Sequence, residues 1–396
     1  PPRSGGRAAR RGRSAPRRMI YLDPNASAPL RREAAAAMAE LAARAPGNPS
    51  SAHAAGRAAR AALEQARRVL AAALGVRAGE VVFTSGGTES NNLALLGALS
   101  DPHGAHVVVS PIEHASVLGP VRELERRGAR VSWLAVDAAG RIDPADVAAA
   151  CEPATALVSV GWANNEIGTV QPIAAIAAQC RARGVLLHVD AAQALGKLRL
   201  DLSDVDLCSL SAHKLGGPVG VGALVVRRGV ALRPLVWGGE QERGARPGTE
   251  NAAGAVGFAA ALQAAAGDDA AALGARRDRL WAAIADLPGV RRHSPVEPVL
   301  AGVLNVSLDG LRGEALVAGL DLEGVAVSVG SACAAGSGEP SHVLRAIGCD
   351  DATASGALRF SLGPTTTAAD VDAAAAALRR VVGRMRGVAP RAAVGG

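Results

Sequence analysis

Lysine is scarce in this 396-residue chain, because only two of its 43 basic residues are lysines and the other 41 are arginines. Arginine stays protonated in proteins, whereas a lysine can lose its proton and bond covalently to a carbonyl carbon as an imine. A chain that uses arginine wherever charge suffices therefore has a specific use for Lys214, which lies in the stretch Ser211-Ala212-His213-Lys214. Taken alone, Lys214 is either a solvated surface residue or the lysine of a Schiff-base enzyme, and its neighbours must decide.

Long apolar runs and aromatic side chains are also missing. No apolar run approaches the roughly 18 to 20 residues that a membrane-spanning helix needs, so we expect no membrane partner. Aromatic residues make up 2% of the chain and hydrophobic residues 49%, so a sizeable core must be packed by Ala, Leu and Val. Without aromatic residues interleaved in a basic stretch, the sequence predicts no direct contact with nucleic acid.

The net charge of +7 is confined to one end of the chain. Residues 1–18 hold seven arginines and no acidic residue, so residues 19–396 are neutral overall. Residues 1–18 have no apolar core of a secretory signal and fit a disordered Arg-rich extension, with a transit peptide as the alternative. The main body therefore has no electrostatic signature of a nucleic-acid-binding protein.

The cysteine count is low and odd. The five cysteines are an unsuitable set for a disulfide framework in a chain of this length, which predicts reduced thiols in the cytoplasm. No two of them have the spacing of metal ligands, so we predict no metal site. They are Cys151, Cys180, Cys208, Cys333 and Cys349.

Short Val-rich runs alternate with Ala-rich helical segments between residues 81 and 226. The run 81–84 is followed by a Gly-rich turn, residues 85–90, which we expect to lead straight into a helix beginning near Asn91. This alternation favours an α/β fold with crossover connections and a mainly parallel sheet, although the closely spaced runs 207–211 and 221–226 suggest one antiparallel exception. We expect a large domain over residues 19–255, whose first segment packs with a smaller C-terminal α/β domain over residues 256–396.

Polar residues follow five of the predicted strands. Ligands of open parallel sheets bind outside the carboxyl ends of the strands, so these groups are expected to meet at one site. In chain order the strand ends carry Gly87 and Thr88, then His114, Asn165, Asp190 with Gln193, and finally Ser211, His213 and Lys214.

Each of these groups suits one part of pyridoxal phosphate. A lysine holds the aldehyde as an imine, a carboxylate such as Asp190 keeps the pyridine nitrogen protonated, and a Gly-Thr helix start such as Gly87-Thr88 binds the phosphate. The alternative for Asp190 is a helix N-cap, and for Gly87-Thr88 an ordinary strand-to-helix turn. Together the groups predict a pyridoxal-phosphate enzyme.

At this point the chain resembles the cysteine desulfurases of the class V aminotransferase family over about residues 19–385. The matching stretches agree in order, spacing and identity. They are residues 47–53 (GNPSSAH), 83–92 (FTSGGTESNN), 164–168 (NNEIG), 188–193 (HVDAAQ), 211–214 (SAHK), 248–251 (GTEN), 330–333 (GSAC), 339–344 (EPSHVL) and 359–363 (RFSLG). The resemblance implies a three-layer α/β/α large domain of the type I pyridoxal-phosphate transferase fold.

The resemblance also implies a role for each matching residue. Lys214 would hold the cofactor and shuttle the Cα proton, His114 would stack on the ring and transfer protons, and Asp190 would pair with the pyridine nitrogen. Arg359 and Asn165 would bind the substrate carboxylate. The other implied cofactor contacts are Gly87, Thr88, Asn165, Gln193, Ser211, His213 and, from the second subunit of a homodimer, Thr249.

Cys333 distinguishes desulfuration from transamination in this resemblance. It lies in a run of small residues from Gly330 to Gly338, and such a loop can carry a thiol between a buried cofactor and an external acceptor. The implied reaction converts L-cysteine to L-alanine and leaves a persulfide on Cys333, whose sulfur passes to an acceptor protein for iron-sulfur cluster assembly or tRNA thiolation. A selenocysteine lyase, another class V aminotransferase and a non-catalytic sulfur-transfer scaffold are the alternatives.

The chain departs from the family pattern at a few positions. Ser27-Ala28 stands where two threonines are usual, and Val219 replaces a usual lysine. Neither change removes a residue to which the resemblance gives a catalytic role.

Overall fold

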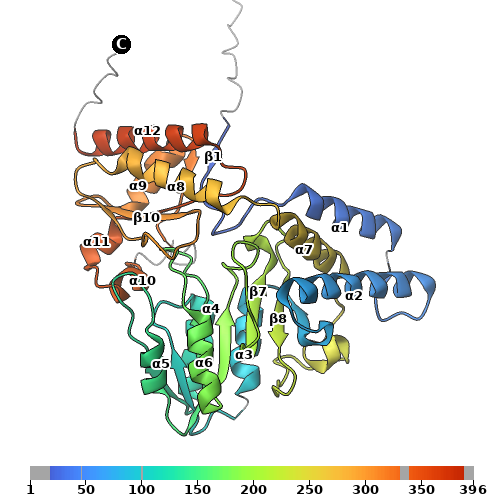
Figure 1. Cartoon of the computed structure of the whole chain (residues 1–396). Coiled ribbons are helices and arrows are strands. Elements are labelled where there is room, and N and C mark those ends of the chain that lie inside the picture. The colour runs from blue at the N-terminus through green and yellow to red at the C-terminus, as the bar shows by residue number, and fades with distance from the viewer. Residues whose placement is uncertain (1–17, 46, 100, 331–338, 388–396) are drawn as a thin grey trace, which may run out of the picture.

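The computed structural model describes residues 18–45, 47–99, 101–330 and 339–387 (Figure 1). Within these ranges the largest sheet has seven strands in the order β2-β8-β7-β6-β5-β3-β4. Their bounds are β2 (Val81–Thr84), β3 (His106–Val109), β4 (Arg130–Trp133), β5 (Thr155–Gly161), β6 (Leu186–Asp190), β7 (Leu207–Ser211) and β8 (Gly222–Val226).

This sheet is parallel apart from one strand. Strands β4, β3, β5, β6 and β7 pair in parallel, and β8 runs antiparallel to both β7 and β2. The predicted antiparallel exception between residues 207–211 and 221–226 is therefore confirmed. Because Gly161 pairs with Asp190 and Asp190 with Ser209, the carboxyl ends of β5, β6 and β7 lie together at one edge.

Helices cover both faces of the sheet, which makes the predicted three-layer α/β/α arrangement. In β3, Val107 and Val109 pack with the helices of one face, whereas Val108 belongs to the core of the other face. Both faces of a strand are thus buried, as its continuous apolar run predicts. One face carries α3 (Gly87–Ala98) and α4 (Ala115–Arg126), and the other carries α2 (Ala54–Leu74), α5 (Pro144–Ala150), α6 (Ile173–Arg183) and α7 (Ala252–Ala265), with α1 (Arg32–Arg44) packed on α7.

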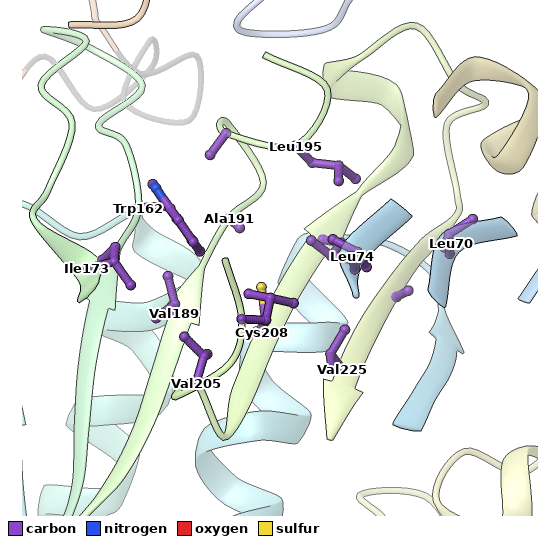
Figure 2. Packing of buried hydrophobic residues seen from close by; sticks show 14 of the residues in the cluster. Leu70, Leu74, Trp162, Ile173, Val189, Ala191, Leu195, Val205, Cys208 and Val225 are labelled. Carbon is purple, nitrogen blue, oxygen red and sulfur yellow. The ribbon is translucent and has the colours of Figure 1, made fainter. Parts of the chain in front are cut away.

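The larger core contains Cys208 at its centre. Figure 2 shows Cys208 of β7 between Val189 of β6 and Val225 of β8, which are its neighbours in the sheet. Cys208 and Cys180 are both buried in this apolar cluster, as expected for small core residues.

A second unit packs around a smaller sheet. Strands β9 (Val290–Arg292), β10 (Val303–Leu308) and β12 (Ala357–Ser361) form an antiparallel sheet in the order β12-β10-β9, and β1 (Ile20–Tyr21) pairs in parallel with β11 (Val325–Ala326). Leu22 belongs to the same core, so the N-terminal segment lies with this unit. Its helices are α8 (Ala270–Ile284), α9 (Gly313–Leu322), α10 (His342–Ala346), α11 (Asp351–Ser355) and α12 (Ala368–Met385).

The predicted boundary between residues 255 and 256 falls inside α7. The buried apolar residues of this helix, from Ala255 to Ala265, all pack in the core of the seven-stranded sheet. A long Ala-rich helix shows no change of composition along its length that could mark a boundary. We therefore place the boundary after α7.

The junction between β2 and α3 positions one wall of the site. We expected the helix to begin near Asn91, but α3 begins at Gly87. Gly86 has a φ of 152°, which residues with a Cβ rarely adopt, so the chain can leave the strand and enter the helix without a connecting loop. Gly222 of β8 also needs to be a glycine, because a Cβ there would lie 2.6 Å from the Cα of Gly86.

A buried ion pair anchors the segment that precedes α7. The guanidinium of Arg67 donates hydrogen bonds of 2.6 and 2.8 Å to the two carboxylate oxygens of Glu242 and one of 2.8 Å to the carbonyl of Val81. Glu242 also accepts a bond of 2.9 Å from the backbone N–H of Phe83. Glu242 and Arg243 lie in η3 (Gln241–Gly244) with φ values of 49° and 59°, so these contacts hold a strained turn against β2.

Candidate active site

A cavity of about 240 Å³ lies at the carboxyl ends of β5, β6 and β7, at the edge where the sheet also meets the start of α3. Ten of the residues predicted for the site line it, although they come from segments far apart in the sequence. They are Gly87, Thr88, His114, Asn165, Asp190, Gln193, Ser211, His213, Lys214 and Arg359. These ten residues therefore lie together around one cavity.

The other two predicted site residues are Thr249 and Cys333. Thr249 is exposed in the segment between η3 and α7 and does not line the cavity of its own chain. Cys333 lies outside the residues that the structure describes. Within the described part of the chain, no group of three or more His, Cys, Asp or Glu side chains could hold a metal ion.

Lys214 ends the short 3-10 helix η2 (Ala212–Lys214), which follows β7 directly. Its Nζ donates hydrogen bonds to the backbone carbonyl oxygens of Asn25 (2.7 Å) and Ala26 (2.9 Å). The N-terminal segment thus holds Lys214 at the cavity. No pattern in the sequence predicted this contact.

Asp190 is the last residue of β6 and is oriented by two donors. The side-chain amide of Asn91 donates to Oδ2 (2.7 Å), and the backbone N–H of Ala192 donates to Oδ1 (2.9 Å). Asn91 is completely buried in α3, so the carboxylate is held against the cavity wall rather than free to turn toward water. Asp190 therefore caps the turn that follows β6, and it also presents its carboxylate to the cavity.

His114 precedes α4 and caps it. The backbone N–H of Ser116 donates to Nδ1 (3.1 Å), so Nδ1 is unprotonated and the neutral ring carries its proton on Nε2. Burial lowers the pKa of His114, the carboxylate of Asp190 raises it, and the charges of Lys214 and His342 lower it. At neutral pH the ring is therefore a neutral N–H donor. A chain of hydrogen bonds connects it to Asp190: His114 Nδ1 lies 2.7 Å from Ser116 Oγ, and the Asn91 amide donates both to that Oγ (2.8 Å) and to Asp190 Oδ2 (2.7 Å).

The start of α3 and the end of β7 make a cradle suited to an anion. The N-cap Gly86 has no side chain to occupy the first-turn amides of this 12-residue helix. Ser211 lies beside this turn, since a Cβ on Gly87 would be 3.6 Å from the Ser211 Cβ, and the buried Ser211 Oγ has no hydrogen-bond partner among the described residues. An orphaned buried hydroxyl at a helix N-terminus fits a phosphate.

Arg359 of β12 brings a buried cation to the other side of the cavity. It is 1% exposed, donates to Asp23 Oδ1 (2.5 Å) and to the backbone carbonyl of Asn165 (3.3 Å), and its Nε has no partner within the described residues. Asp23 compensates the charge on one edge of the guanidinium only. The unused donor leaves capacity for a carboxylate ligand.

Glu113 is buried beside Asp190, and its pKa is raised to about 8. Burial is the main cause, and the Asp190 charge adds to it, while a hydrogen bond of 2.7 Å from the Gly161 N–H acts in the opposite direction. At neutral pH Glu113 is therefore a neutral carboxylic acid.

Replacing Glu113 by Gln is expected to stabilise the protein at alkaline pH. The folded carboxyl keeps its proton up to about pH 8, whereas the unfolded one loses it near 4.5, so the free energy of unfolding falls as the pH rises between these values. Glu113→Gln removes this loss, which is on the order of 3 kcal/mol at pH 8 and small at pH 5. Thermal unfolding at both pH values measures it.

The exposed Glu123→Gln is the matched control, because hydrogen bonds from Arg126 and Arg127 lower the pKa of Glu123 to about 2, well below both test values. Its effect should be the same at pH 5 and pH 8. A Glu113→Gln variant that gains no more stability at pH 8 than at pH 5 would contradict the assignment of a neutral Glu113.

A second cavity of about 420 Å³ adjoins the first, and His114 and Asn165 line both. Val329 lines it on one side of the segment 331–338 and Glu339 on the other. The chain on either side of that segment is anchored on Glu166, which accepts a hydrogen bond of 2.6 Å from Ser341 Oγ and lies so close to Gly330 that a Cβ there would be 2.8 Å from Oε2. The described residues on the two sides of this segment therefore lie beside Glu166, which also lines the second cavity.

Comparison with known proteins agrees with this geometry. The family model described as aminotransferase class-V matches residues 20–374. A cysteine desulfurase of Bradyrhizobium diazoefficiens is 46% identical over 93% of this chain and 95% of its own length. The chain belongs to the cysteine desulfurases of the class V aminotransferase family. An IscS-like cysteine desulfurase of Mycobacterium tuberculosis is 44% identical over 95% of this chain and 99% of its own length.

Solved structures of related proteins share the fold of this class V aminotransferase. A NifS-like protein superimposes with a TM-score of 0.86 at 34% identity, covering 93% of this chain and 100% of its own. A structure described as SspA in complex with cysteine gives a TM-score of 0.78 at 36% identity, covering 88% of this chain and 99% of its own.

The departures from the family pattern at Ser27 and Val219 leave the residues assigned to the site unchanged. Ser27 keeps a hydroxyl, and its Oγ lies 3.2 Å from His213 Nδ1 at the cavity. Val219 is 76% exposed, so the loss of a lysine there does not affect the site of this cysteine desulfurase family member.

Four residues of the site were not given a role by the sequence. Asn91 and Glu113 stand inside the matched motifs, so their burial was the missing information. Lys197 is the second of the two lysines, and the scarcity argument applies to it as well as to Lys214. Asn25, which holds the lysine, had no signal of its own, because only the tertiary fold brings residues 23–28 to the end of β7.

Proposed function

We propose that this protein is a pyridoxal-phosphate-dependent cysteine desulfurase that forms L-alanine from L-cysteine and retains the sulfur as a persulfide on Cys333. The cavity itself carries the proposal. Lys214, Asp190 and His114 meet there with the anion cradle at the start of α3, and Arg359 adds a guanidinium with one unused donor. The structure of SspA with cysteine supports the choice of substrate.

The chain's own residues fit the cofactor by their chemistry. Thr88, Ser211 and His213 would hold the phosphate, together with Gly87 at the start of α3 and Thr249 of a second subunit in a homodimer. Asp190 would face the pyridine nitrogen, and Asn165 and Gln193 would face the ring's phenolic oxygen. When bound, pyridoxal phosphate supplies an aldehyde that condenses with amines and a ring that accepts electrons from the substrate Cα.

Substrate binding and proton transfer are assigned to three side chains of the cavity. Arg359 binds and orients the substrate carboxylate through donors that Asp23 leaves unused. Lys214, whose Nζ is held by Asn25 and Ala26, moves a proton to and from the Cα. His114 presents the Nε2–H of a neutral ring as a hydrogen-bond donor, because burial lowers its pKa.

Sulfur transfer is assigned to Cys333. Its thiolate Sγ bonds to the substrate sulfur while the substrate C–S bond breaks, and the electron pair of that bond leaves with the carbon, which takes up a proton to give alanine. Cys333 is oxidised to the persulfide as the carbon is reduced, so no external oxidant is needed. The persulfide then passes its outer sulfur to an acceptor protein, for which an iron-sulfur scaffold or a tRNA-thiolation carrier is our proposal.

A cytoplasmic location is part of the same proposal. Cys151, Cys180, Cys208 and Cys349 are free thiols, which suits a reducing compartment. No helix within the described residues is long and apolar enough to cross a membrane.

Replacing Cys333 by Ala tests the function directly. With L-cysteine as substrate, the wild type should form alanine and protein-bound sulfur in equal amounts before reductant is added, and the modified peptide should contain Cys333. Cys333→Ala should lower both by on the order of 10³-fold or more, because the nucleophile is removed. The visible absorbance of the bound cofactor should be unchanged.

Cys349→Ala is the matched control, since Cys349 is a half-buried thiol with a neighbouring His293 and lies away from the cavity. It should keep both products. Undiminished alanine formation by Cys333→Ala would overturn the role of Cys333, and a wild type that forms alanine only from L-selenocysteine would favour a selenocysteine lyase.

A further inference from the structure

Lys197, which does not line the cavity, lies behind Gln193 in the turn that follows β6. Its Nζ donates to Gln193 Oε1 (2.9 Å) and to Asn25 Oδ1 (3.2 Å). The turn places the two side chains together, because Leu195 N–H bonds to the Ala191 carbonyl and Leu198 N–H to the Ala194 carbonyl, which gives Gln193 and Lys197 helical i,i+4 spacing.

These contacts determine which end of the Gln193 amide faces which neighbour. Because the backbone carbonyl of Asn25 can only accept, the Gln193 atom that faces it is the amide nitrogen, so the carbonyl Oε1 faces Lys197, whose Nζ can donate to it in either protonation state. The amide nitrogen Nε2 donates to the backbone carbonyl of Asn25 (3.0 Å), which can only accept. Nε2 has two hydrogens, and one of them remains for the cavity that Gln193 lines.

We propose that Lys197 is a positioning residue that fixes Gln193 as a hydrogen-bond donor toward an oxygen of the bound cofactor and holds Asn25 where it contacts Lys214. The inference rests on the proposed function, because the oxygen belongs to pyridoxal phosphate. Lys197 acts through its two partners and touches neither substrate nor cofactor.

The physical setting explains why this position is a lysine in a chain that otherwise uses arginine. Burial, together with the positive charges of Lys214 and Arg359, lowers the pKa of Lys197 to about 7. A lysine can lose its proton near these two cations and still donate N–H bonds, whereas an arginine would remain charged. The geometry also leaves two buried acceptors, Gln193 Oε1 and Asn25 Oδ1, that would be unpaired without Lys197.

The test compares Lys197→Met, Gln193→Leu and the double variant in the full-length protein loaded with pyridoxal phosphate. The readouts are the position of the visible absorbance band and the dissociation constant of pyridoxal phosphate for the stripped protein. We expect Lys197→Met to shift the band and to weaken cofactor binding about tenfold, the loss of one hydrogen bond to a charged group. In the Gln193→Leu background the same change should have less than about a twofold effect, since the residue acts through Gln193.

Arg199→Met is the matched control, because Arg199 is an exposed cation two residues away, and its band and affinity should match the wild type. A Lys197→Met variant with wild-type band and affinity, or effects of Lys197→Met and Gln193→Leu that simply add, would overturn the inference. A change of melting temperature without a spectral change would do the same, because it marks a structural role. If the wild type itself binds no pyridoxal phosphate, the proposed function fails instead.

Discussion

Lys214→Ala is expected to lower L-cysteine turnover by on the order of 10³-fold or more, because no other described residue that lines the cavity carries an amine that can form an imine and return the proton to the Cα. Lys214→Arg should be equally inactive, since it keeps the charge and the hydrogen-bond donors toward Asn25 and Ala26 but cannot form an imine. Steady-state alanine formation measures the loss.

The lysine content of the chain makes the chemical test of this prediction unambiguous. Borohydride reduction of the wild type should attach the cofactor to a peptide that contains Lys214, and mass spectrometry can distinguish it from the only other lysine peptide, that of Lys197. Neither Lys214 variant should be labelled. More than a tenth of wild-type turnover in Lys214→Ala, or attachment to Lys197 in the wild type, would refute the assignment.

Arg67→Met is expected to destabilise the fold by about 3 to 5 kcal/mol, the usual effect of removing one partner from a buried ion pair. Arg67 and Glu242 are almost completely buried, and without the guanidinium Glu242 keeps only the Phe83 N–H as a donor while its turn remains strained. Glu242→Gln should cost less, because the amide retains an acceptor and the shape of the side chain. Urea and thermal unfolding measure both losses.

Arg68→Met is the control for this pair, since Arg68 is the next residue of α2, is exposed and contacts only Gln65 through its side chain in the bonds described. It should change the free energy of unfolding by less than about 0.5 kcal/mol. If Arg67→Met is no more destabilising than Arg68→Met, then the pair does not anchor the segment before α7.

The sequence predicted the strands and the composition of the site because both depend on local pattern and on one rule of topology. Thr88, His114 and Asp190 each follow an apolar run, and parallel strands bring their carboxyl ends to one edge. The start of α3 was misjudged by a few residues, since the sequence alone did not reveal the φ of Gly86.

The remaining parts of the site depend on contacts between distant segments. The raised pKa of Glu113 needs both its burial and its proximity to Asp190, and neither has a local signature. Asn25 lies 189 residues from Lys214 in the chain, and its contact with that lysine follows from how the N-terminal segment crosses the molecule. The end of the large domain could not be predicted, because the composition of α7 is uniform along its length. Only the packing of α7 on the seven-stranded sheet shows that the whole helix belongs to the large domain.

That N-terminal segment joins the two sheets by a continuous backbone. Residues 20–22 bond to β11 and β12 in the smaller unit, and the next residues, Asn25 and Ala26, accept the hydrogen bonds of Lys214. A rotation of the smaller unit would therefore pull directly on the acceptors of the lysine, over a distance of only three residues.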